Sequence, residues 1–263
     1  MTADKVVLER RGPVALITLN SPETSNSMDL ELGGAMFRVL EAAARDQAVR
    51  SVVLTGQGRT FSAGANIKAM RYEVTKNPNL TPSQVLKGFI EVFNRAAVLI
   101  FEMDKPVVAA VNGTAAGGGM ALALACDIIL ASSSARFDPA YVRMGLVPVG
   151  GMSAIIPQLA GRKLATEFLF LARPIDAAEA RAMGLINRVT VPDEVLPEAM
   201  KLAQVLAEKP RQSIARTKKL LNQADASDLA GQMAREEVHL RACADTPEHR
   251  AIVEAFVKKD LTK

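Results

Sequence analysis

The chain has 263 residues, of which 49% are hydrophobic and 23% charged, and this composition is typical of a folded globular protein rather than a disordered one. Its net charge of +4 comes from 32 basic residues scattered among 28 acidic ones, and aromatic residues make up only 4%, which argues against a nucleic-acid partner. The N-terminus lacks the apolar region of a signal peptide and no segment reaches about 18 consecutive apolar residues, so we expect a soluble cytoplasmic protein with no membrane partner.

The first half of the chain alternates short apolar runs with helical periodicity. Two β-rich runs, VVLER and VALITLN, flank Gly12 and Pro13 and predict a hairpin. Residues 30–46 have the spacing of an amphipathic helix. The runs at 51–56, 106–113 and 126–132 are continuously apolar and β-branched, as in strands covered on both faces. Strands that alternate with helices in this way indicate the α/β class.

Two segments of this half resemble each other. A strand at 51–55 leads to the small residues 63–65, and a strand at 107–111 leads to three glycines at 117–119, at nearly the same distance. We interpret the pair as a repeated unit of strand, glycine loop and helix start. Free N–H groups at the two helix starts offer a place for negative charge, although a glycine run is also typical of a tight turn.

The polar stretch before Thr81 reads as a mobile loop, and Thr81 with Gln84 predicts a capping box that begins a helix. A second capping box is expected at Asp176 and Glu179. From about residue 153 the pattern becomes predominantly helical. The apolar stripes of these helices need a partner, which could be the core or another subunit.

Four ordered motifs carry a family resemblance: FSAGANIKAM, AAVNGTAAGGGMALALACDIILAS, ARFDPAYVRMGLVPVGG and EARAMGLINRV. Together they resemble the enoyl-CoA hydratase/isomerase family, the crotonases, over essentially the whole chain. The resemblance implies a crotonase-like (ClpP/crotonase) α/β core over residues 1–195, in which repeated ββα units form two roughly perpendicular sheets. A C-terminal helical oligomerisation region over residues 196–263, which forms trimers, and a homotrimer or hexamer are implied as well. It also implies an enzyme of fatty acid metabolism whose substrate is an acyl-CoA thioester, so that coenzyme A belongs to the substrate and no separate cofactor is expected.

The same resemblance implies particular site residues. By position in the motifs, the backbone N–H groups of Ala65 and Gly118 would form an oxyanion hole for the thioester oxygen. Coenzyme A would lie along Thr24, Ser25, Ala63, Asn66, Ile67 and Lys68, with Lys258 or Lys259 near its phosphates. No metal site is expected, because the two cysteines, Cys126 and Cys243, and the two histidines form no ligand cluster.

The chain departs from the family where carboxylates are usual. Ala121 and Ala140 stand at the positions of the two hydratase glutamates, and Val149 replaces the aspartate of isomerase-like relatives. Because a positioned acid or base supplies about 10²–10⁴-fold, hydration by the usual route is not expected. Asp138 is a weak catalytic candidate that is also typical of a turn, and Tyr141 could either donate a hydrogen bond or fill the core.

Three functions therefore remain open. The first is isomerase- or lyase-type chemistry through an oxyanion-hole-stabilised enolate. The second is decarboxylation of a malonyl-type thioester, which generates the enolate by losing carbon dioxide and needs no base. The third is an inactive subunit that binds acyl-CoA. The sequence does not name the acyl group.

Overall fold

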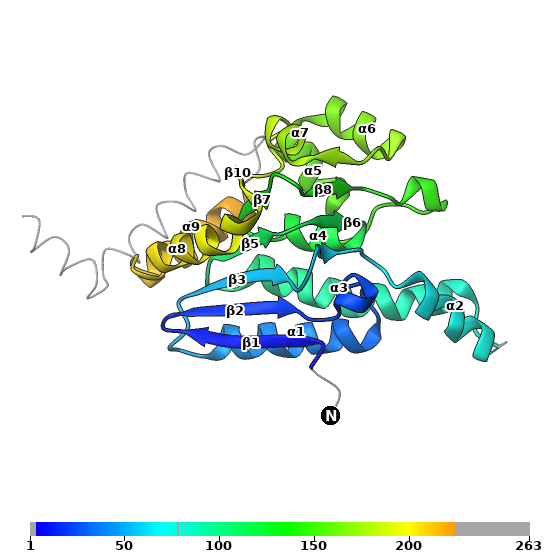
Figure 1. Cartoon of the computed structure of the whole chain (residues 1–263), viewed down its shortest axis with the longest axis horizontal. Helices are drawn as coiled ribbons and strands as arrows, with labels where there is room; N and C mark the ends of the chain where they lie inside the picture. Colours follow the sequence, from blue (N-terminus) through cyan, green and yellow to red (C-terminus); the bar gives the residue numbers. More distant parts are fainter. Residues whose placement is uncertain (1–3, 78, 225–263) are drawn as a thin grey trace, which may run out of the picture.

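The computed structural model describes residues 4–77 and 79–224, and it contains a six-stranded sheet at its centre (Figure 1). In spatial order the strands are β1 (Val6–Arg11), β2 (Val14–Leu19), β3 (Ser51–Gly56), β5 (Val107–Val111), β7 (Ile128–Ser132) and β10 (Arg188–Thr190). β1 and β2 form the predicted antiparallel hairpin, and each later neighbour pairs in parallel. The α/β class is confirmed.

A second, smaller sheet continues three of these strands. It consists, in order, of β4 (Thr60–Ser62), β6 (Thr114–Ala116), β8 (Arg136–Asp138) and β9 (Ile175–Asp176). β4 follows β3, β6 follows β5 and β8 follows β7, so neighbouring strands of the large sheet lead into neighbouring strands of the small one. The predicted repeat is therefore present, and it brings the two glycine loops side by side.

Helices cover both faces of the large sheet (Figure 1). Ala15, Ile17 and Leu54 join the core cluster that includes α1 (Leu30–Arg45) and α3 (Pro82–Glu102). Their neighbours along the strands point to the other face, where Val14 and Val53 pack in a cluster with α8 (Val195–Ala207). This alternation explains why the strands read as continuous apolar runs.

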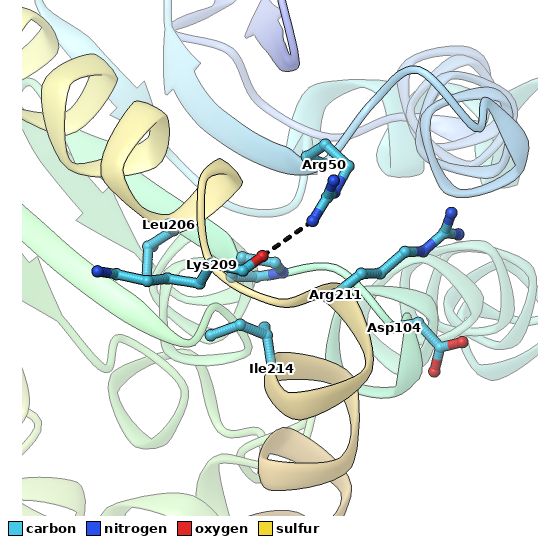
Figure 2. Close-up of a pocket in the computed structure, with 7 residues that line it drawn as sticks. Arg50, Asp104, Leu206, Lys209, Arg211 and Ile214 are labelled. Carbon is cyan, nitrogen blue, oxygen red and sulfur yellow. Dashed lines mark hydrogen bonds between the residues drawn. The ribbon is translucent and has the colours of Figure 1, made fainter. Parts of the chain in front are cut away.

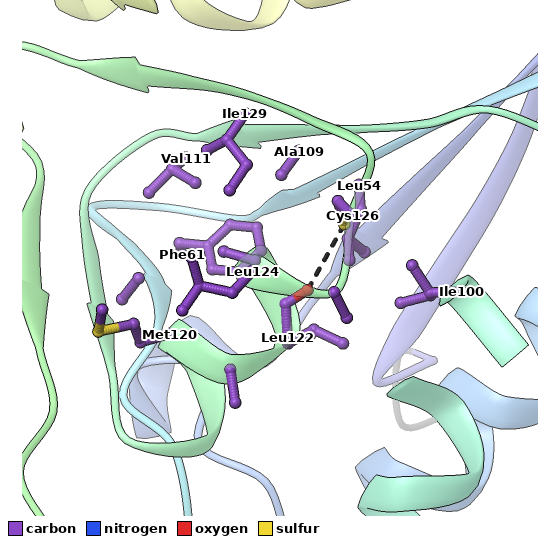
Figure 3. Close-up of a cluster of buried hydrophobic side chains, with 14 of the residues drawn as sticks. Leu54, Phe61, Ile100, Ala109, Val111, Met120, Leu122, Leu124, Cys126 and Ile129 are labelled. Carbon is purple, nitrogen blue, oxygen red and sulfur yellow. Dashed lines mark hydrogen bonds between the residues drawn. The ribbon is translucent and has the colours of Figure 1, made fainter. Parts of the chain in front are cut away.

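Helix α4 (Gly118–Leu124) lies inside the core, as Figure 3 shows. Met120, Leu122 and Leu124 pack with Phe61 of β4 and with side chains of the large sheet. The Cys126 thiol just after α4 is buried and donates to the carbonyl of Leu122 at 3.5 Å. Because α4 is enclosed by the core, its first residue is held in a fixed place.

The prediction of a loop before Thr81 is partly wrong, because helix α2 (Ile67–Lys76) extends into this segment. The Asn66 side chain begins this helix by accepting from the Ala69 N–H at 3.0 Å. Met70 is the only buried residue of α2, so the apolar stripe of this helix is too narrow to be recognised from the sequence. The capping box of Thr81 and Gln84 is confirmed.

Up to residue 224, five α-helices follow the small sheet's third strand: α5 (Met152–Ala160), α6 (Arg162–Leu171), α7 (Ala177–Ala182), α8 and α9 (Arg211–Asn222). Asp176 caps α7 by accepting from the Glu179 N–H. In α9 the buried Lys218 ammonium donates to the Ile100 carbonyl at 2.7 Å and to the Asp127 carboxylate at 2.8 Å. This ion pair ties α9 to the core. The division of the chain at residue 196 stays a prediction.

Within the two described ranges, no helix is both long enough and apolar enough to cross a membrane. The predicted helical segment from 225 onward, with Lys258 and Lys259, lies outside the described residues.

Candidate active site

One cavity of about 410 Å³ opens beside the two glycine loops. It is lined by Met28, Ala63, Ala65, Ile67, Met70, Leu86, Phe89, Ile90, Phe93, Ala116, Gly117, Gly118, Asp138, Ala140, Tyr141, Met144, Leu146, Val147 and Val149. A second hollow, between Arg50 and the turn before α9, encloses only about 10 Å³ (Figure 2). That volume holds about one water molecule. The larger cavity is therefore the candidate site.

The backbone around Ala65 is fixed by the segment that precedes α1. The Met28 N–H donates to the Gly64 carbonyl at 2.6 Å, and the Met28 carbonyl accepts from the Asn66 N–H at 2.9 Å. Met28 and Ala65 thus form a parallel bridge, in which Gly64 and Asn66 bond to Met28. The N–H of Ala65, which lies between Gly64 and Asn66, points to the opposite side. The Ala65 N–H thus faces away from Met28 and has no hydrogen-bond partner among the described residues.

Gly118 is the first residue of α4, and its N–H also lacks a partner within the described part of the chain. The preceding Gly117 has a φ of +49° and donates its own N–H to the Asp138 carbonyl at 2.8 Å. This bond anchors the loop to β8. The dipole of α4 adds a partial positive charge at the same point.

The two loops lie against each other. A Cβ built on Gly64, whose φ is +82°, would lie 3.0 Å from the Gly118 nitrogen and 2.5 Å from the Ala116 carbonyl oxygen. A Cβ on Gly119 would lie 2.2 Å from the Ser62 carbonyl oxygen. Glycine is therefore required at both positions, because only a residue without Cβ allows this approach. The unpaired N–H groups of Ala65 and Gly118 consequently belong to one small region.

The segment before Met28 is held by a side chain that the sequence analysis did not single out. The buried Asn26 amide donates to the carbonyls of Gln57 at 3.0 Å and Thr60 at 2.7 Å. The Ser62 hydroxyl in turn donates to the Asn26 carbonyl at 2.9 Å. These partners come from distant parts of the chain, so no local pattern reveals them.

Asp138 lies at the cavity, but both oxygens of its carboxylate are occupied. Oδ1 accepts from the Ala140 N–H at 2.9 Å, and the Arg143 guanidinium contacts both oxygens, at 2.7 and 2.8 Å. Asp138 is therefore a turn residue, and its ion pair with Arg143 stabilises the turn. Asp138 is the only residue with a carboxyl group among the described residues that line the cavity.

Tyr141 forms part of the cavity wall next to the glycines. Its Cζ lies 3.9 Å from the place where a Cβ of Gly117 would stand. Burial raises the pKa of the phenol to about 12, and the nearby Val149 N–H opposes this rise. The approach of that N–H does not complete a hydrogen bond, and the hydroxyl has no partner among the described residues.

The three positions at which the resemblance led us to expect carboxylates, Ala121, Ala140 and Val149, lie in different surroundings. Ala121 is buried inside α4. Ala140 lines the cavity and has a φ of +52°, a left-handed conformation imposed by the turn at Asp138. Val149 lines the cavity from the loop before α5.

The residues expected along coenzyme A are only partly brought together. Ala63 and Ile67 line the cavity, and the Ser25 carbonyl accepts from the Ala63 N–H at 3.0 Å. The exposed Thr24 precedes Ser25, and the exposed Lys68 follows Ile67 on the first turn of α2. The Asn66 side chain is used to cap α2.

These features define an α/β protein whose cavity is bordered by two glycine loops with unpaired backbone N–H groups. The sequence model of the enoyl-CoA hydratase/isomerase family matches residues 9–262. The chain belongs to this family, as the resemblance predicted.

Similar proteins agree with this assignment. A short-chain-enoyl-CoA hydratase of Clostridium acetobutylicum is 33% identical over 98% of this chain and 97% of its own. A 1,2-epoxyphenylacetyl-CoA isomerase of Escherichia coli is 34% identical over 94% and 92%, respectively. The crystal structure of an enoyl-CoA hydratase from Polaromonas sp. JS666 has a TM-score of 0.89 at 33% identity and covers 97% of each chain. The crotonase-like fold is therefore confirmed.

Proposed function

We propose that the chain is an enzyme that binds an acyl-CoA thioester in the large cavity and stabilises an enolate oxygen there with two backbone N–H groups. The observation that carries this proposal is the close approach of Gly64 to the Gly118 nitrogen, with the N–H groups of Ala65 and Gly118 both unpaired among the described residues. Each such donor contributes about 3 kcal/mol to the stabilisation of a developing oxyanion.

Coenzyme A enters as part of the substrate in this proposal. Ala63 and Ile67 line the cavity on the side where Ser25 and Lys68 are exposed, so the pantetheine and nucleotide would leave the cavity there. The apolar side chains of α2, α3 and the 142–149 segment would then enclose the acyl group. We further propose a homotrimer or hexamer, which light scattering of the purified protein tests.

The reaction would depart from hydration by the usual route. Ala121 and Ala140 provide no carboxylate, and Asp138 is held by Arg143 and Ala140. A proton transfer that needs a free carboxylate therefore has no side chain for it among the described lining residues. Isomerisation of an acyl group activated by the oxyanion hole is the first candidate, and its proton shift would require a base from outside the described lining residues.

Decarboxylation of a malonyl-type thioester is a second candidate, and the same lack of a free carboxylate favours it. Loss of carbon dioxide leaves its electron pair as the enolate, so the step needs the oxyanion hole and no base. Initial rates on crotonyl-CoA, 3-enoyl-CoA and methylmalonyl-CoA distinguish hydration, isomerisation and decarboxylation. Hydration at the rates of ordinary hydratases would contradict the significance given to Ala121 and Ala140.

Two substitutions at Gly118 test the oxyanion hole itself. Gly118→Pro removes the N–H at the first position of a helix, where proline is tolerated. Gly118→Ala keeps the N–H, and its Cβ would meet the Phe93 ring at 3.7 Å, an ordinary contact. We expect kcat to fall by about 10²–10³-fold in the proline variant and by far less in the alanine variant. Equal activity of the two variants would contradict the proposal.

Binding of acyl-CoA without turnover of any thioester would instead indicate an inactive binding subunit.

A further inference from the structure

The Ser62 residue joins three parts of the candidate site, and the proposed chemistry gives it no role. Its hydroxyl donates to the Asn26 carbonyl at 2.9 Å and accepts from the Gly64 N–H at 3.3 Å. Its own carbonyl oxygen would lie 2.2 Å from a Cβ on Gly119, the second residue of α4. Ser62 is completely buried and does not line the cavity, so any effect on a ligand is exerted through the backbone.

The Asn26 end of this connection is fixed. Asn26 has a φ of +51°, and a non-glycine residue keeps such a conformation only where its surroundings hold it. Its side-chain oxygen accepts from the Ser21 N–H at 2.9 Å. Its amide donates to the Gln57 and Thr60 carbonyls. The Asn26 carbonyl is therefore a rigid acceptor for the Ser62 hydroxyl.

The Gly64 end of this connection affects the direction of the Ala65 N–H. Gly64 has a φ of +82°, and because glycine permits many conformations, hydrogen bonds have to fix the peptide groups on its two sides. The Ser62 hydroxyl binds the N–H of the peptide group before Gly64, and the Met28 N–H binds the carbonyl of the group after it. That second group also carries the Ala65 N–H, which points away from the carbonyl because the peptide bond is trans. A rotation at Gly64 would therefore turn the Ala65 N–H.

We propose that Ser62 is a positioning residue for the oxyanion hole: its hydroxyl ties Gly64 to the Asn26 carbonyl and thereby keeps the Ala65 N–H directed toward the thioester oxygen. This inference rests on the proposed function of the Ala65 and Gly118 N–H groups. Without the hydroxyl, the buried Gly64 N–H and the Asn26 carbonyl would each lose a partner, and buried polar groups reorient toward other partners. The backbone at Gly64 would then adopt several orientations in place of one.

The infrared band of a bound thioester carbonyl tests this inference, because the donors of an oxyanion hole polarise the carbonyl and lower its stretching frequency. Butyryl-CoA, isotopically labelled at the carbonyl carbon, is added to the wild-type protein, to Ser62→Ala and to Ser51→Ala. Ser51 is a matched control. It is completely buried in β3, its hydroxyl donates to the Ala203 carbonyl at 2.8 Å, and it does not line the cavity.

We expect the band to move to lower frequency on binding to the wild-type protein and to Ser51→Ala, and most of this shift to be lost in Ser62→Ala. On the best thioester of the panel, kcat should fall by about 10–100-fold in Ser62→Ala, while KM changes by less than about threefold. Ser51→Ala should lose stability in thermal unfolding and keep its kcat.

Equal band shifts in Ser62→Ala and Ser51→Ala would overturn the inference and leave the proposed function in place. No binding of butyryl-CoA to the wild-type protein, or binding without a band shift, would overturn both. If Ser62→Ala does not fold, Ser62→Cys takes its place under the same criteria, because a thiol fills the site of the hydroxyl and is a weaker donor and acceptor.

Discussion

Gly64→Ala perturbs the contact between the two loops without removing any donor. The added Cβ would lie 2.5 Å from the Ala116 oxygen and 3.0 Å from the Gly118 nitrogen. Since unstrained contacts need about 3.5 Å, the backbone of the second loop has to move by about 1 Å. The Gly118 N–H would move with it, away from the Ala65 N–H.

Two costs follow from this substitution. Alanine at a φ of +82° loses about 1–2 kcal/mol of stability, because its Cβ crowds the backbone in the left-handed region. A misplacement of about 1 Å in a catalytic group lowers the rate by about 10²-fold. We therefore expect Gly64→Ala to fold with reduced stability and to lose about 100-fold in kcat.

Gly12→Ala is the matched control, because Gly12 has a φ of +63° in the β1–β2 hairpin and a Cβ there meets nothing within 4 Å. It should lose similar stability in thermal unfolding and no activity. Steady-state kinetics on the best thioester of the panel compare the two variants. A folded Gly64→Ala protein as active as Gly12→Ala would refute the idea that the two loops act together on one oxygen.

Three further outcomes are expected. Asp138→Asn should keep activity within about threefold, because the Asn oxygen can still accept from the Ala140 N–H, whereas a loss above about 100-fold in initial rate would identify a general base. The free energy of unfolding should fall by up to about 2–3 kcal/mol as the pH rises from 10 to 12. The reason is that folding raises the pKa of Tyr141 to about 12, so the folded state keeps a proton that the unfolded chain loses. Urea titrations should show a smaller decrease in the Tyr141→Phe variant. Lys218→Met should lower the free energy of unfolding in urea by about 3–5 kcal/mol because it leaves the Asp127 carboxylate without its cation, and adding Asp127→Asn should restore part of the loss.

The large sheet was predictable because its strands carry a strong local signal. Residues 51–56 and 107–111 are apolar on both sides, and the structure buries them between helices on both faces. The second sheet was expected only from the family resemblance, and its strands could not be identified from the residues, because β4, β6, β8 and β9 have only two or three residues each. A period of two cannot be recognised over so short a length.

The candidate site was predictable only where glycine marks it. The glycines at 64 and 117–119 indicated close backbone approach, and the structure shows that approach. The state of Tyr141 was not predictable, because its surroundings at Gly117 and Val149 come from separate loops. The occupied carboxylate of Asp138 likewise depends on Arg143, five residues away across a turn.

Part of the apolar wall of the cavity, at Met70 and Phe89, is assembled separately from the frame that holds the glycine loops. Met70, Val85 and Phe89 form a small cluster of their own on α2 and α3, apart from the cluster that contains α4. Substitutions at Met70 or Phe89 would change the space in the cavity without replacing a residue of the cluster that contains α4. The protein can thus acquire a new substrate preference, in evolution or in engineering, without rebuilding its reaction centre.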